Sequence, residues 1–161
     1  IQAIAGNILG ALNEICSGID KSGENDGLVE NAISGVSMMV LFRDAAFKGL
    51  LGENERIGVL NVLMQSLPLR NVDSVSKICM DGLYQLIESG EVDISAHAST
   101  LMKIFAETFQ LVVDGDEVAT PETCAQFKQV LAKMQQQVDS SVMETAFSGL
   151  DGDEQVCIQM A

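Results

Sequence analysis

Residues 120–138 read TPETCAQFKQVLAKMQQQV and contain the clearest helix signal in the chain. Thr120 is a good N-cap, and Pro121 suits the first helical position, where its missing N–H is not needed. An apolar stripe then recurs at steps of three and four residues, at Cys124, Phe127, Leu131, Met134 and Val138. The opposite face carries Gln and Lys. This stretch predicts an amphipathic helix with one buried side.

The same pattern continues on both sides of this helix. Apolar stripes predict helices over residues 1–19, 28–42, 57–67, 73–89 and 95–113, with two short helices after residue 138. The stripe of the third runs from Ile57 to Leu67, and that of the fifth ends at Val112. Pro68 and Gly90 provide stop signals, while Asp151 and Glu154 have the spacing of a capping box. No segment alternates with a period of two, so the sequence predicts an all-α fold.

The spacing of the helices predicts how they are arranged. The second, fourth and sixth begin near residues 28, 73 and 120, each after a partner helix, and repeats of about 40–47 residues are typical of HEAT and armadillo arrays. We therefore expect a HEAT-type α-solenoid of stacked antiparallel helix pairs, with about three repeats plus short terminal helices, as a single segment over residues 1–161. A closed helical bundle, which needs no regular period, is the alternative.

The charge balance limits the possible partners. Nine Lys and Arg face 23 Asp and Glu, a net charge of −14. Phosphate binding needs clustered cations, so we expect neither nucleic acid nor an anionic membrane surface as a partner. Such a field attracts basic peptides and basic protein patches. The alternative is that the acidity only keeps the chain soluble. No uncharged apolar run is long enough to span a bilayer.

The residues that carry most enzyme chemistry are scattered. Cys16, Cys79, Cys124 and Cys157 are far apart and form no CxxC pair, which argues against zinc and a disulfide framework and favours a reducing compartment. His97 is the single histidine, without the spaced partners of a catalytic triad. No glycine-rich phosphate loop occurs. We predict a protein without enzymatic activity, cofactor or metal.

Calcium is the one metal for which the sequence offers a partial pattern. From Asp20, the stretch DKSGENDGLVEN places acidic and polar residues at alternating positions, as an EF-hand loop does. However, Asn25 stands where the turn needs Gly, and Asn31 stands where the loop needs Glu. The DGDE loops that begin at Asp114 and Asp151 lack the same two features. We interpret these stretches as helix caps and solvated turns.

Polar residues on the outer faces of two helices are candidates for partner binding. In a solenoid, one helix of each pair lines the concave side, which commonly binds partners. Residues of the second and fourth helices would then contribute to a polar, acidic inner wall: Glu30, Asn31, Asp81, Tyr84 and Glu88. The alternative is that they form an ordinary hydrated face.

Several stretches in order resemble one family. The closing repeats of importin-β3 (karyopherin-β3) nuclear transport receptors are similar to ENAISGV at 30–36, QSLPLRNVDSV at 65–75, LYQLIES at 83–89, TLMKIFAETF at 100–109 and ETCAQFKQVLAKMQ at 122–135. A short DDEQ-like helix at 151–161 follows, close to where those receptors stop. The chain lacks the tryptophans that the family places before its LPL turn, and its loop after LYQLIES is shorter. The Glu30–Asn31 pair matches an acidic–Asn pair on an inner helix of the family.

The resemblance implies a receptor of roughly twenty HEAT repeats that binds cargo on its concave face. Such receptors carry basic cargo proteins with nuclear localisation signals between cytoplasm and nucleus. They cross the nuclear pore through phenylalanine-glycine nucleoporins and release cargo on Ran-GTP, which binds their amino-terminal repeats. A non-enzymatic HEAT scaffold of another assembly is the alternative. The chain begins in mid-pattern at Ile1, so we expect a carboxy-terminal fragment of a longer protein that self-associates through the apolar stripe of residues 1–19.

Overall fold

The structure is a computed structural model that describes residues 30–33, 35, 53–70 and 73–161. All regular structure in these ranges is helical, which confirms the predicted all-α class for this part of the chain. Residues 30–33 and 35 are helical, and the complete helices are α3 (Glu53–Ser66), α4 (Asp73–Glu88), α5 (Ala98–Asp114), α6 (Pro121–Gln137), α7 (Ser140–Ser148) and α8 (Gly152–Gln159). The helix predicted over residues 1–19, and with it the expected self-association face, lies outside the described residues.

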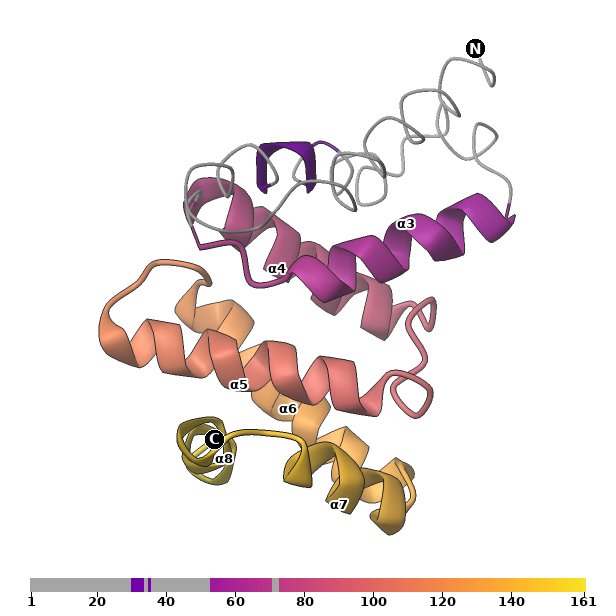
Figure 1. Ribbon diagram of the computed structural model, residues 1–161, viewed down its shortest axis with the longest axis vertical. Helices are drawn as coiled ribbons and strands as arrows, with labels where there is room; N and C mark the ends of the chain where they lie inside the picture. Colours follow the sequence, from indigo (N-terminus) through magenta and orange to yellow (C-terminus); the bar gives the residue numbers. More distant parts are fainter. Residues whose placement is uncertain (1–29, 34, 36–52, 71–72) are drawn as a thin grey trace.

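The helices are stacked in tiers along the longest axis of the molecule (Figure 1). α3 and α4 form one tier, α5 and α6 the next, and α7 and α8 the last. Helix α5 contacts α3, α6, α7 and α8, while α4 packs against α6. The tiers therefore produce two layers, one with α3, α5 and α7 and the other with α4 and α6.

The core is built from the predicted apolar stripes. A continuous cluster of buried side chains runs through α3, α4, α5 and α6. Near its centre the rings of Phe105 and Phe127 stack with their centroids 4.4 Å apart. A smaller cluster joins Met102 and Ala106 of α5 to Ala146 and Leu150 near α7. Both faces of α5 are thus covered, which makes it the central helix of the described part.

Two residues predicted to face inward do not. Ile57 is 53% exposed because the buried side of α3 is formed by Val59, Leu63 and Met64. Val112 is also exposed, at 37%, because the burial of α5 ends at Phe109. Predicted stripes are thus correct in the middle of these helices and wrong near one end of each.

The predicted helix ends are largely confirmed. The Thr120 side chain accepts a hydrogen bond from the backbone N–H of Thr123 at 3.1 Å, with Pro121 in the first turn. Asp151 and Glu154 form the predicted capping box at the start of α8. Gly90 follows α4 with φ of 75°, a conformation that favours glycine. Among the described helices, none has both the length and the apolar character needed to cross a membrane.

Candidate functional site

Three of the five predicted partner-binding residues lie where α4 meets α6. Asp81, Tyr84 and Glu88 are three and four residues apart, so they share one side of α4. The Thr123 hydroxyl of α6 donates to the Asp81 carboxylate, and Lys133 of α6 pairs with Glu88. The Tyr84 side chain is half-buried and packs against the core. Contacts with α6 therefore occupy part of this side of α4.

A third polar link lies on the same side of α4, where Lys77 pairs with Glu117 of the loop that leads into α6. We refer to the three pairs Lys77–Glu117, Asp81–Thr123 and Glu88–Lys133 as the α4–α6 seam. The paired residues are 40, 42 and 45 positions apart. The two ion pairs are exposed and screened by solvent, so they stabilise the fold little, and the seam mainly aligns the helices.

The seam shifts the titration of its charged groups. The hydrogen bond from Lys77 holds the pKa of Glu117 below its ordinary value. The hydrogen bond to Glu88 raises the pKa of Lys133. Both shifts favour the charged form of the group, as expected for the partners of an ion pair.

The other two predicted residues, Glu30 and Asn31, lie in the described helical residues 30–33. Asn31 is exposed and Glu30 is half-buried. The Glu30 carboxylate accepts a hydrogen bond from the backbone N–H of Arg70 at 2.9 Å. Glu30 thus connects its helix to the loop between α3 and α4, at the edge of a groove that the sequence did not indicate.

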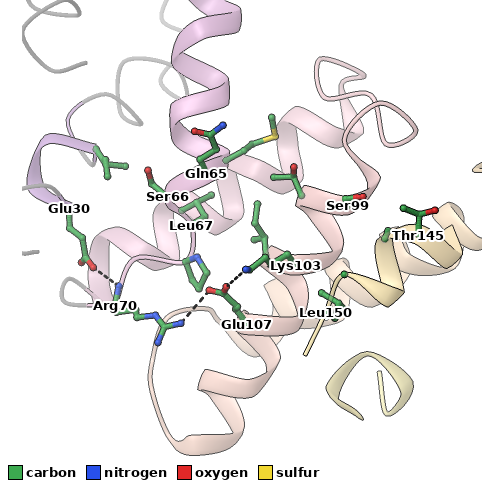
Figure 2. Close-up of a pocket in the computed structure, with 17 residues that line it drawn as sticks. Glu30, Gln65, Ser66, Leu67, Arg70, Ser99, Lys103, Glu107, Thr145 and Leu150 are labelled. Atoms are coloured by element: carbon green, nitrogen blue, oxygen red, sulfur yellow. Dashed lines mark hydrogen bonds and ion pairs between the residues drawn. The ribbon is translucent and has the colours of Figure 1, made fainter. Parts of the chain in front are cut away.

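This groove has a volume of about 640 Å³. Its walls come from the end of α3, the loop that follows, α5, α7 and the helical residues near 30 (Figure 2). The floor is apolar and includes Ile33, Met64, Leu67, Ile104 and Leu150. Polar side chains at the walls include Gln65, Ser99 and Thr145.

Two cations share one carboxylate at this groove. Arg70 Nη2 donates to Glu107 Oε2 at 3.3 Å, and Lys103 Nζ lies 3.9 Å from Glu107 Oε1. The Arg70 and Lys103 side chains are each 60% exposed, whereas Glu107 is 20% exposed. We refer to these three residues as the charged rim. The sequence contained one signal for it, the Lys103–Glu107 pair at i,i+4, but nothing that connected this pair to Arg70.

Groups suited to catalysis are not assembled in the described ranges. His97 occupies the N-cap position of α5 without a side-chain capping bond. No cluster of three or more His, Cys, Asp or Glu suited to a metal ion occurs there. Burial raises the pKa of Cys124 and of Cys157, which disfavours the thiolate that a nucleophile requires.

Comparisons with known proteins do not extend this description. No protein family, curated protein or solved structure matches the chain.

Proposed function

We propose that the chain is a HEAT-type helical-repeat segment of an importin-β-type nuclear transport receptor, and that its acidic side binds basic cargo. The α4–α6 seam is the observation that supports this most directly. Its pairs join residues 40 to 45 positions apart, which is the period of HEAT arrays, about 40–47 residues. Equivalent positions of consecutive repeats face each other when such repeats stack, and a two-layer arrangement results.

The charge of the chain suits this role. A net charge of −14 attracts Lys- and Arg-rich localisation signals over the Debye length and repels nucleic acid. In this proposal the segment closes the superhelix, while nucleoporins and Ran-GTP bind through the full-length receptor. The protein would then move between the cytoplasm and the nucleus through the pore, without enzymatic activity.

The seam also indicates how a basic peptide would bind. Glu88 already holds an ammonium group, that of Lys133. A cargo lysine can replace this internal partner because the pair is exposed and the exchange conserves charge. Tyr84 lies between Asp81 and Glu88 on the same side of α4, and the part of it that is exposed can contact the lysine stem. The cargo site therefore centres on Asp81, Tyr84 and Glu88 of α4, with Glu30 and Asn31 in the helical residues 30–33 as further members.

The test is a titration of the whole chain with a fluorescent Lys-rich localisation peptide, at low and at physiological salt. A peptide of scrambled order and equal charge is the reference. We expect the localisation peptide to bind more tightly than the scramble, and the Glu88→Gln and Asn31→Ala variants to lose about two- to fivefold in affinity each. Glu144→Gln, an exposed change on α7, is the matched control and should have no effect.

Equal binding of the two peptides that disappears with added salt would leave only a diffuse acidic field. The scaffold alternative would then be favoured, since it has the same architecture but no selectivity for localisation signals.

A further inference from the structure

We propose that the groove between α3, α5 and α7 is a second binding site, for an extended peptide in which an apolar side chain precedes a carboxylate. This site differs from the proposed cargo site in position and in charge. The cargo site lies at the α4–α6 seam and takes cations, whereas the groove takes an anion. Glu30 is common to both sites, but Lys103 and Glu107 belong to the groove alone, so variants of these two residues test the groove independently.

Glu107 indicates what the groove binds. Its carboxylate lies between Arg70 and Lys103, where a ligand carboxylate would interact with the same two cations (Figure 2). The internal contacts are loose: the Arg70 distance of 3.3 Å is long for a charged hydrogen bond, and the Lys103 distance of 3.9 Å is beyond one. A guanidinium has five N–H donors and an ammonium has three. The rim thus keeps donors available for a second carboxylate.

The two cations of the rim line the groove, whereas the other described lysines make their contacts elsewhere. Lys77 and Lys133 are paired within the α4–α6 seam, and Lys128 lies 5.9 Å from the centroid of the Phe109 ring. Arg70 and Lys103 are the cations that line the groove. The whole chain carries a charge of −14, whereas in the described lining of the groove Arg70 and Lys103 balance Glu30 and Glu107. An acidic peptide is therefore repelled less at this groove than the net charge of the chain implies.

The apolar floor supplies the second part of the recognition. Leu67, Ile104 and Leu150 line the groove together with the rim, and the groove volume of about 640 Å³ is ample for a large side chain. Ligand sites commonly measure about 300–1,000 Å³ and combine an apolar lining with a few polar groups. Gln65 and Ser99, also in the walls, can hydrogen-bond a peptide backbone.

The test uses two fluorescein-labelled peptide pools and the whole chain. In the first pool a Leu or Phe is followed by Glu within Gly and Ser residues; in the second, Gln replaces the Glu. Fluorescence anisotropy at low salt should show tighter binding of the Glu pool. Lys103→Gln should weaken that binding by about two- to fivefold, since it removes one exposed charge.

Glu107→Gln gives the sharpest result. If Glu107 occupies the place of a ligand carboxylate, the variant should bind the Glu pool about two- to fivefold more tightly, because the internal competitor has lost its charge. Lys128→Gln, outside the groove, is the control and should bind as the unchanged chain does. Equal binding of the two pools would overturn the proposal, as would weaker binding by Glu107→Gln at an unchanged melting temperature. If Glu107→Gln has a lower melting temperature than the unchanged chain, Lys103→Gln decides instead. Weaker binding of the Glu pool by that variant supports the proposal, and unchanged binding overturns it.

Discussion

Ser76 on α4 has a buried hydroxyl that no hydrogen-bond partner satisfies among the described residues. An unsatisfied buried polar group destabilises the folded state, so we expect Ser76→Ala to leave the free energy of unfolding unchanged or to raise it by up to about 1 kcal/mol. Thr108→Val is the matched comparison, because the Thr108 hydroxyl is equally buried but donates to the Ile104 carbonyl at 2.6 Å. That variant should lose about 0.5–1.5 kcal/mol.

Urea denaturation followed by circular dichroism measures both changes. A Ser76→Ala protein that is clearly less stable than the unchanged chain would show that the hydroxyl does have a stabilising partner in solution.

At the scale of an element, α6 depends on its N-cap, the residue just before its first turn. The Thr120 side chain satisfies one backbone N–H that the helix start would otherwise leave unpaired. We expect Thr120→Ala to reduce the free energy of unfolding by about 1 kcal/mol, the usual value for the loss of an N-cap. Thr120→Ser keeps the oxygen and should retain most of the stability. Equal losses in the two variants would attribute the effect to the methyl group instead of the cap.

At the scale of the whole molecule, two carboxylates make the stability of the fold depend on pH in the acid range. Lys77 lowers the pKa of Glu117, and the Ser141 hydroxyl lowers the pKa of Asp139, the N-cap of α7. A lowered folded-state pKa gives a contribution that is present above the unfolded value and is lost as the pH falls through the folded one. The urea midpoint should therefore decrease on acidification below the ordinary pKa of 3.8 for Asp139. Asp139→Asn still caps the helix but cannot titrate, so its midpoint should decrease less.

In alkaline solution the pH dependence of stability has the opposite sign. The pKa of Lys133 is raised above its ordinary 10.5 by the hydrogen bond to Glu88. Its contribution is complete below that value and is lost as the pH rises through the raised one. Lys133→Gln should therefore show a weaker decrease of the urea midpoint in strong alkali than the unchanged chain. An identical decrease in both proteins would assign the alkaline transition to other groups.

The sequence by itself determined the helices, their ends and most of their buried sides in the described part. The cap at Thr120, the capping box at Asp151 and the stripe through Phe127 and Met134 were predicted and found. These features depend on residues within about four positions of one another, because helical hydrogen bonds and side-chain neighbours are that local.

Only the tertiary structure decided which polar faces meet. Asp81 and Glu88 were correctly placed on one side of α4, but the spacing could not show that α6 covers this side with Thr123 and Lys133. Likewise, Arg70 and Glu107 are 37 positions apart in the sequence, so their spacing did not indicate the charged rim. Such contacts depend on how far one helix slides and turns against the next, and that register is set by the packing of all the buried side chains together.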